Sequence, residues 1–215
     1  MRLAVIPAKG TSRRIPGKNL RLFHGHPIMA YSIETALRSG LFDHVAVSTE
    51  SYEVTEVAKR YGAEIVKRPF DLAEIHMPDC GTQEVARHAI ETYIKGGCPI
   101  THACCIYPTA PLMLVEDLYW GWAILNGTFP PADFVYSIGY NLKDAGQWYW
   151  GTAQAFLNRR PLHNVEPDVL RVPIDDARVC DINTEEDWQR AEQLFVLQAC
   201  LSTPRHTPKP QQGET

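Results

Sequence analysis

The sequence predicts a three-layer α/β/α fold around a mostly parallel sheet. Short apolar runs that are typical of buried strands alternate with segments whose apolar residues recur at helical spacing. This alternation continues from Leu3 to about Ser137, which favours βαβ units over an all-helical or all-strand fold. With 215 residues, 45% of them hydrophobic, the chain is long enough to bury the core that such a sheet needs. Loops that follow parallel strands collect at one edge of the sheet, where such folds bind ligands.

Capping residues set the bounds of the elements in the first half of the chain. Gly40 is placed to end the first helix, Ser51 can begin the second helix, and Gly62 follows its end. Thr82 precedes the third helix. The expected elements are, in order, a strand at 3–7, a polar loop at 8–19, a helix over 29–37, a strand at 45–47, a helix over 54–61, a strand at 65–66, a helix over 85–93, a strand at 102–107, a helix over 115–125 and a strand at 134–137.

The second half is less regular. Residues 147–150, 170–173 and 178–181 are expected to form strands. Thr184-Glu185-Glu186-Asp187 is similar to a capping box and predicts a final helix that runs to about Leu201. From Ser202 the composition shifts to Pro, Gln and Gly, which is typical of disorder. We therefore expect a single domain at 1–201 and a disordered tail at 202–215.

Bulk properties exclude several classes of function. A formal net charge of −4 and a pI near 6.1 argue against non-specific nucleic-acid binding, which usually needs a basic surface. No apolar run approaches the length of a membrane span, and the apolar run after Arg2 is too short for a secretory signal. The six cysteines show no CxxC pair and no zinc-ligand spacing. A cytoplasmic protein with reduced thiols fits this pattern best.

The loop after the first strand carries the most chemical information. It reads Pro7-Ala8-Lys9-Gly10-Thr11-Ser12-Arg13-Arg14-Ile15-Pro16-Gly17-Lys18-Asn19, and residues 8–19 are called the N-terminal loop below. Gly10 and Ser12 let backbone N–H groups approach an anion, while the cations neutralise its charge, so a triphosphate is the expected partner. The loop lacks the GxxxxGK[ST] spacing of a Walker A loop and the glycines of a nicotinamide-binding loop. A solvated basic loop is the alternative interpretation.

Several ordered blocks give the chain a family resemblance. The N-terminal loop resembles the signature loop of the acylneuraminate cytidylyltransferases, which activate nine-carbon 2-keto sugar acids with CTP. Two later blocks, which begin at Cys104 and at Asp144, resemble the pseudaminic acid branch in particular. The blocks that agree in order are Gly25-His26-Pro27, Val47-Ser48-Thr49-Glu50, Lys67-Arg68-Pro69, Cys104-Cys105-Ile106-Tyr107-Pro108-Thr109-Ala110-Pro111-Leu112, Asp144-Ala145-Gly146-Gln147-Trp148-Tyr149-Trp150 and Asp181-Ile182-Asn183-Thr184-Glu185-Glu186-Asp187-Trp188.

The resemblance implies a Rossmann-like fold of the nucleotide-diphospho-sugar transferase type and a role for each matching residue. Catalysis would rest on Lys18, Arg13 and Asp181, with pyrophosphate leaving as the sugar's anomeric hydroxyl attacks the α-phosphorus. Mg²⁺ would be bound by Asp181 and Asn183. The residues that would contact CTP or the sugar acid are Ala8, Lys9, Gly10, Ser12, Asn19, Arg68, Thr82, Pro108, Thr109, Ala110 and Gln147.

The chain departs from the family pattern at three places. The family normally has Asp-x-Asp at the metal position, whereas this chain reads Asp181-Ile182-Asn183 and so loses one anionic ligand. Lys9 stands where an Arg is usual, which exchanges a bidentate fork for a point charge. Relatives also carry a longer segment between Ser137 and Asp144 that contributes to the sugar pocket and to the arm of a homodimer, and here only residues 138–143 remain.

These observations leave more than one function open. The first hypothesis is a cytidylyltransferase that joins CMP to a pseudaminic-type or sialic-type sugar acid, with no nucleic-acid or membrane partner. The second is a nucleotide-binding homologue that has lost catalysis and acts as a partner or regulatory protein, which Asn183 and the shortened segment 138–143 motivate. The third is a nucleotidyltransferase for another sugar acid or another nucleotide.

Overall fold

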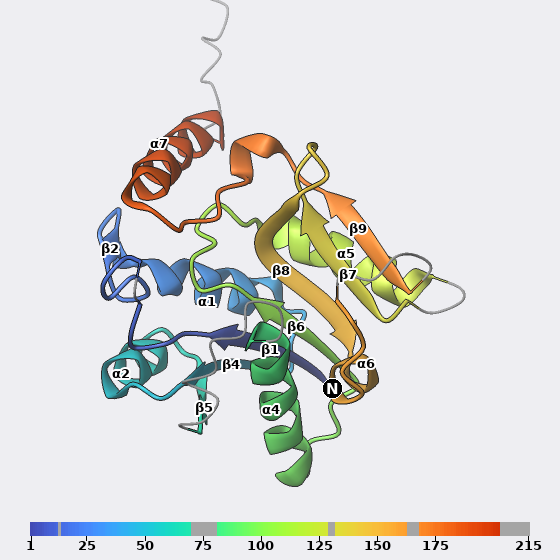
Figure 1. Cartoon of the computed structure of the whole chain (residues 1–215). Coiled ribbons are helices and arrows are strands. Elements are labelled where there is room, and N and C mark those ends of the chain that lie inside the picture. The colour runs from blue at the N-terminus through green and yellow to red at the C-terminus, as the bar shows by residue number, and fades with distance from the viewer. Residues whose placement is uncertain (13, 70–80, 129–131, 163–167, 203–215) are drawn as a thin grey trace, which may run out of the picture.

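A computed structural model of the chain describes residues 1–12, 14–69, 81–128, 132–162 and 168–202, and it contains one large sheet of seven strands (Figure 1). All neighbouring pairs in this sheet are parallel except the two that involve β8. The expected three-layer, mostly parallel architecture is confirmed. Across the sheet the strands are β5 (Glu64–Lys67), β4 (His44–Thr49), β1 (Arg2–Pro7), β6 (His102–Ile106), β8 (Asp144–Thr152), β7 (Phe134–Ile138) and β9 (Val169–Pro173).

Helices cover both faces of the sheet. On one face lie α1 (Ile28–Ser39), α2 (Tyr52–Arg60) and α5 (Val115–Gly127), and on the other lie α4 (Gly81–Lys95) and α6 (Ala153–Leu157) (Figure 1). On α5, Gly121 lets the helix pack directly onto Trp148 and Trp150, since a Cβ there would lie 2.5 Å from the Trp148 ring. Both tryptophans are fully buried, and truncating such a side chain typically costs about 3–5 kcal/mol.

Three expected caps are present. The Ser51 hydroxyl accepts a hydrogen bond of 3.3 Å from Val54 N at the start of α2, and Gly40 ends α1. The last helix, α7 (Glu185–Ser202), begins with the predicted capping box: Thr184 Oγ1 accepts from Asp187 N at 3.2 Å, and the Asp187 carboxylate accepts from Thr184 N at 2.8 Å. These short-range signals therefore predict the end of α1 and the starts of α2 and α7 correctly.

Several expected details were wrong. Residues 178–181 form no strand, because the Asp175 carboxylate accepts from Ala177 N at 2.9 Å and starts a 3₁₀ turn at Asp176–Arg178, after which the chain leaves the sheet. Helix α4 begins one residue before Thr82. Helix α6 and the short hairpin of β2 (Leu22–Phe23) and β3 (His26–Pro27) were not expected. Ser202 belongs to α7, and the rest of the expected tail, 203–215, lies outside the described residues.

The strand directions bring the candidate residues to one edge. Because β1, β4, β5 and β6 are parallel, their carboxyl ends meet there, and β8, which is antiparallel to β6, begins there. After β9 the chain returns along this edge as residues 174–184, called the crossing segment below, and continues into α7 (Figure 1). Trp188 and Ala191 of α7 and Ile182 of the crossing segment pack with Ile15, Phe23 and Ile28. In the described part of the chain, no helix has the length and apolar character needed to cross a membrane.

Candidate active site

The N-terminal loop starts tightly bound to the end of β4. Ala8 N donates to Ser48 O at 3.0 Å, and Gly10 N donates to the Glu50 carboxylate at 2.8 Å. A Cβ at Gly10 would lie 2.5 Å from Ser51 Cβ, so only glycine allows the loop to pass this close to the start of α2. The loop therefore has a defined path at its first turn.

The end of the loop is held from within. Asn19 is buried, and its Nδ2 donates to Lys9 O at 2.9 Å, which ties the two ends of the loop together. This contact makes Asn19 a support of the loop's shape. Lys9 and Ser12 are partly exposed, as ligand contacts require, whereas the expected phosphate ligand Arg13 lies outside the described residues.

Lys18 reaches from the loop to the crossing segment. Its Nζ donates to Ile182 O at 2.6 Å. Burial lowers the pKa of Lys18, and the nearby Asp181 carboxylate opposes that change. The ammonium group is thus partly buried and within electrostatic reach of Asp181, another residue to which the resemblance assigns a catalytic role.

Asp181 and Asn183 lie side by side in the crossing segment. Asn183 Nδ2 donates to the Asp181 carboxylate at 2.6 Å, and Asn183 N donates to the Asp187 carboxylate at 2.9 Å. Gly146, at the start of β8, has a φ of +63°, and a Cβ there would lie 3.4 Å from Asp181 Cβ. The start of β8 thus packs against Asp181.

The donor set fits a hard divalent cation that also binds phosphate. Among the described residues no three His, Cys, Asp or Glu side chains gather into a metal site. Asp181 supplies one exposed carboxylate, and Asn183 supplies one amide oxygen once the amide turns that oxygen toward the carboxylate. Hard divalent cations can bind through one or two carboxylates together with phosphates and water, so a sparse oxygen set of this kind is compatible with one.

The expected nucleotide pocket lies at the ends of β5 and β6. Residues 108–110 are buried directly after β6, and Thr82 Oγ1 lies 3.4 Å from the Tyr107 hydroxyl. Arg68 is buried, with Nη2 donating to Ser48 O at 2.7 Å and Nη1 3.9 Å from the Glu50 carboxylate. Burial lowers the pKa of Arg68, partly offset by Glu50. Arg68 therefore supports the end of β4 and the residue that holds Gly10.

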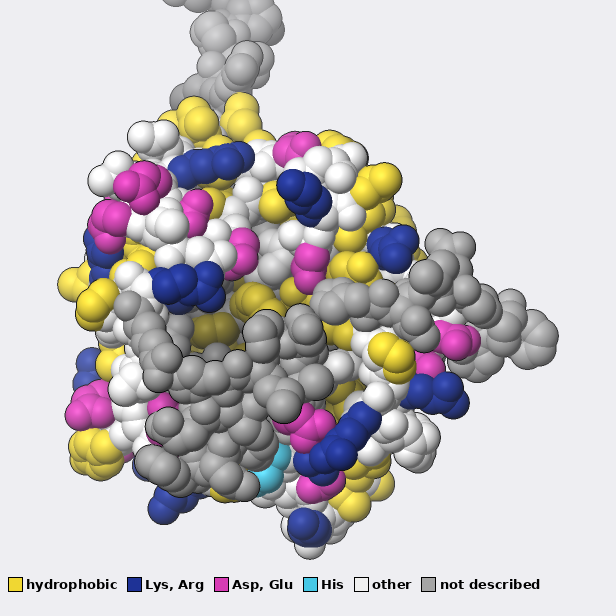
Figure 2. All heavy atoms as spheres, in the orientation of Figure 1, with side chains coloured by type: hydrophobic (Ala, Val, Ile, Leu, Met, Phe, Trp, Pro, Cys, Tyr) yellow, Lys and Arg dark blue, Asp and Glu magenta, His cyan; other side chains and the backbone are white. Residues whose placement is uncertain are grey.

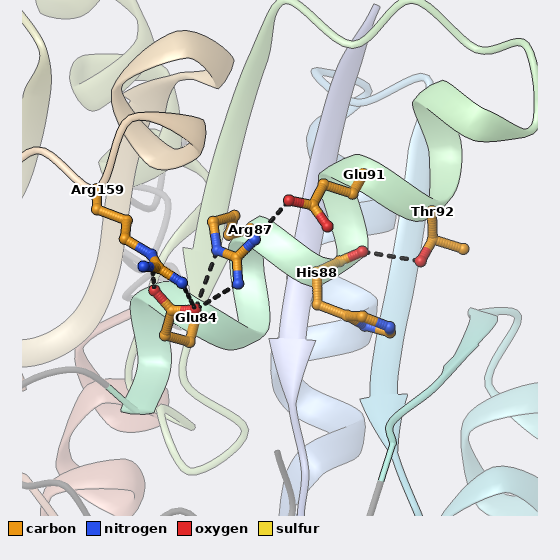
Figure 3. Close-up of polar contacts among 6 residues, drawn as sticks. All are labelled: Glu84, Arg87, His88, Glu91, Thr92 and Arg159. Carbon is orange, nitrogen blue, oxygen red and sulfur yellow. Dashed lines mark hydrogen bonds and ion pairs between the residues drawn. The ribbon is translucent and has the colours of Figure 1, made fainter. Parts of the chain in front are cut away.

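An ion network fixes the helix that carries Thr82 (Figure 3). Glu84 accepts from Arg87 Nη2 at 2.6 Å, and its other oxygen lies 3.0 Å from Arg159 Nε, just after α6. Arg87 also pairs with Glu91 one turn later. The network joins the first turns of α4 to the end of α6, and so sets the position of Thr82 above the sheet.

Gln147 and two tyrosines form a polar layer at the start of β8. Gln147 is buried, its Nε2 donates to Arg178 O at 2.6 Å, and its Oε1 has no hydrogen-bond partner within the described structure. The Tyr149 hydroxyl donates to the Asp144 carboxylate at 2.7 Å, and the Tyr107 ring packs against it. Burial, followed by the neighbouring Tyr107 and Asp144, raises the pKa of Tyr149, so its phenol is neutral and able to donate.

Sequence reasoning missed several of these groups. Tyr107 and Asp144 stood in quoted blocks, and the signal that could have found them was their place at the ends of β6 and β8 at the ligand-binding edge. Arg21, whose guanidinium donates to the Glu185 carboxylate at 2.6 Å, gave no local signal, because the two residues are 164 positions apart.

On the face shown in Figure 2, a hollow with hydrophobic side chains at its floor has a Lys or Arg side chain at its rim.

Comparison with known proteins agrees with this geometry. A family model described as cytidylyltransferase matches residues 3–77, which include the whole N-terminal loop. The pseudaminic acid cytidylyltransferase of Campylobacter jejuni is 33% identical over 229 aligned positions, which cover 91% of this chain and 96% of the relative. The chain belongs to the cytidylyltransferase family.

Solved structures show the same fold as this cytidylyltransferase. CMP:2-keto-3-deoxy-manno-octonic acid synthetase complexed with CTP has a TM-score of 0.69 at 13% identity, covering 92% of this chain and 99% of that one. Rv0371c of Mycobacterium tuberculosis, solved in complex with manganese, has a TM-score of 0.61 at 14% identity, covering 89% of this chain and 98% of that one. At these sequence identities, the two structures show a likeness of fold alone.

The alignment with the Campylobacter relative is longer than the matched part of this chain. The alignment spans 229 positions, whereas the matched part of this chain, 91% of its 215 residues, holds about 196, which leaves a difference of about 33. The Campylobacter relative thus has residues without counterparts here. In the structure, β7 and β8 are joined by a tight turn in which Gly139 N donates to Lys143 O at 2.9 Å and Leu142 N donates to Gly139 O at 2.9 Å.

Proposed function

We propose that the chain transfers CMP from CTP to a nonulosonic sugar acid of the pseudaminic or sialic type and releases pyrophosphate. The observation that carries this proposal is the hydrogen bond of 2.6 Å from Lys18, in the N-terminal loop, to Ile182 O, next to Asp181 in the crossing segment, in a member of the cytidylyltransferase family. The 33% identity to a pseudaminic acid cytidylyltransferase over nearly the whole chain supports the substrate class. We assign this activity to residues 1–201 acting as one domain.

The chain's own residues contribute position and charge. The N-terminal loop would receive the triphosphate between backbone N–H groups near Gly10 and Ser12 and the cations Lys9, Arg13 and Lys18. Lys18 would hold the triphosphate from a fixed position, because its ammonium group donates to Ile182 O at 2.6 Å. Charge that builds up on phosphate oxygens as the sugar hydroxyl attacks is stabilised by such preorganised donors, which typically contribute about 10²–10³ in rate each. No side chain is needed as a nucleophile.

The donor set at Asp181 and Asn183 supports Mg²⁺ as the metal. When bound there, the ion would supply Lewis-acid stabilisation of the triphosphate. The residues of this chain hold its ligands: Asp187 orients the Asn183 backbone at 2.9 Å, and Gly146 packs against Asp181. The manganese in the Mycobacterium tuberculosis structure belongs to that protein, and it makes Mn²⁺ a natural probe here.

The two substrates would occupy different walls of the same edge. The base and ribose of CTP would lie against Arg68, Thr82 and residues 108–110, at the ends of β5 and β6. The sugar acid would lie over the start of β8, the strand that carries Gln147. If the protein forms a homodimer, its arm cannot be the segment between β7 and β8, which is a tight turn here.

Pyrophosphate release tests the proposal. Purified protein is assayed with CTP, Mg²⁺ and a panel of 2-keto sugar acids that includes pseudaminic acid, with the other nucleoside triphosphates as controls. Release with CTP and one sugar acid is expected. A preference for a purine triphosphate would exclude the CTP assignment.

A second candidate function rests on the amide at position 183. An Asn that donates to Asp181, in place of a second carboxylate, is what a nucleotide-binding homologue without catalysis would also show. CTP binding by calorimetry, without pyrophosphate release for any sugar acid in the panel, would favour that function.

A further inference from the structure

Arg21, just after the N-terminal loop, grips the first turn of α7. Its Nη1 and Nη2 donate to the two carboxylate oxygens of Glu185, each at 2.6 Å, and its guanidinium carbon lies 4.2 Å from the centre of the Trp188 ring. A guanidinium that is both paired bidentately and stacked has its orientation fixed in two directions. Arg21 itself is rooted in the loop, because its N donates to Gly17 O at 3.0 Å.

The grip extends along the chain to Asp181. Thr184 N and Asn183 N both donate to the Asp187 carboxylate, at 2.8 and 2.9 Å, so the residues before α7 are fixed to its first turn. The next residue back, Ile182, is fully buried, and its carbonyl accepts from Lys18. Each residue between Asp181 and Glu185 thus has a fixed backbone contact or a fixed side chain, and a displacement of α7 would carry Asp181 with it.

We propose that Arg21, with its partners Glu185 and Trp188, is a positioning residue that sets the separation between Lys18 and Asp181. This inference rests on the proposed function, in which Lys18 contacts the triphosphate and Asp181 contacts the divalent cation bound to it. Through this clamp the loop and the crossing segment present their ligands to one metal–triphosphate complex.

Magnitudes separate this role from a purely structural one. The side chains of Arg21 and Glu185 are 35% and 51% exposed, and an exposed ion pair typically contributes only about 0–1 kcal/mol to stability. Loss of a group that orients metal ligands typically lowers metal affinity by about 10–100-fold. The clamp therefore predicts a large effect on metal binding beside a small effect on unfolding.

The experiment measures Mn²⁺ affinity in the presence of CTP and without any sugar acid, by the EPR signal of free Mn²⁺. The variants are Arg21→Ala, Glu185→Gln and the double variant, and Lys59→Ala, which removes an exposed ion pair of 3.6 Å on α2, is the matched control. Each single variant is expected to lower Mn²⁺ affinity by about 10–100-fold. The double variant should lose no more than Arg21→Ala, because the two side chains act as a unit. CTP affinity in EDTA and the thermal unfolding midpoint should stay near the wild-type values, as they should for the control.

Unchanged Mn²⁺ affinity in Arg21→Ala would overturn the clamp. So would additive losses in the double variant, an equal fall in metal-free CTP affinity, or no Mn²⁺ binding by the wild type with CTP. If the wild type releases no pyrophosphate with any sugar acid yet the variants lose Mn²⁺ affinity as expected, the proposed function fails and the clamp stands.

Discussion

Lys18 donates a hydrogen bond of 2.6 Å from its Nζ to the main-chain oxygen of Ile182, a residue 164 positions later. The contact joins the first βα loop to the segment that carries Asp181. Burial lowers the pKa of Lys18, and the neighbouring Asp181 carboxylate opposes this change because it favours the charged form of the lysine.

Removal of this ammonium group should reduce catalysis with little effect on the fold. Lys18→Ala is expected to lower the rate of pyrophosphate release by about 10²–10³-fold, because one preorganised donor to the triphosphate is lost. The measurement is steady-state kinetics with CTP and the accepted sugar acid, beside circular dichroism and thermal unfolding. Lys59→Ala on α2 is the control for loss of a surface lysine. Unchanged kinetics in Lys18→Ala would remove this residue from the phosphate site.

A methyl group at Gly10 should disturb the loop, and a second change should correct it. In Gly10→Ala the new Cβ would lie 2.5 Å from Ser51 Cβ and 2.9 Å from Ser51 Oγ, so the loop must shift away from α2. Weaker CTP binding by calorimetry is expected. Adding Ser51→Gly removes both clashing atoms, and glycine at an N-cap costs only a few tenths of a kcal/mol relative to serine.

The double variant Gly10→Ala with Ser51→Gly should therefore regain most of the CTP affinity. Ser51→Gly alone should bind CTP as the wild type does. If the double variant binds as weakly as Gly10→Ala, steric contact with Ser51 is not the reason for glycine at position 10.

A second carboxylate at position 183 should bind metal more tightly and destabilise the metal-free protein. In Asn183→Asp, the hydrogen bond of 2.6 Å to Asp181 becomes a contact between two carboxylates. Like charges at this distance raise the pKa of one member of the pair, whereas a divalent cation stabilises both ionised forms. The thermal midpoint should fall in EDTA, and the concentration of Mg²⁺ needed for half-maximal pyrophosphate release should also fall. An unchanged metal titration would show that residue 183 is not a metal ligand.

Much of the fold could be predicted because its signals are local. The spacing of apolar residues predicts the strands and helices, and the caps at Gly40, Ser51 and Thr184 lie within a few residues of the groups they bind. The N-terminal loop was found for the same reason, as its cations and glycines are consecutive. Local patterns thus predicted one half of the candidate site directly.

The rest depends on contacts between distant residues. Residues 178–181 were expected to form a strand, yet whether a strand forms depends on a partner strand, and here Gln147 donates to the Arg178 carbonyl instead. Nothing local to Arg68 predicts that its guanidinium is buried and donates to Ser48 O. No single sequence shows that Arg21 meets Glu185, since loop closure over 164 positions leaves no local trace.

The pH dependence of stability offers a test of the network on α4. Burial favours the neutral form of Glu84, but hydrogen bonds and charges from Arg87 and Arg159 outweigh it and lower its pKa below the ordinary value of 4.5. A carboxyl group whose pKa is lower in the folded state stabilises the protein above its unfolded pKa, and this stability is lost as the pH falls through the folded pKa.

Glu84→Gln should therefore be less stable than the wild type at neutral pH, by about 1–3 kcal/mol for hydrogen bonds to a charged group. The difference should shrink as the pH falls below 4.5, because the wild-type carboxyl group then loses its charge. Urea unfolding at several pH values measures it, with Glu56→Gln on α2, whose carboxylate lies 3.6 Å from Lys59 in an exposed pair, as the matched control. A deficit that stays constant down to acid pH would show that Glu84 stabilises α4 by packing, because only its ionised form can accept from both arginines through both oxygens.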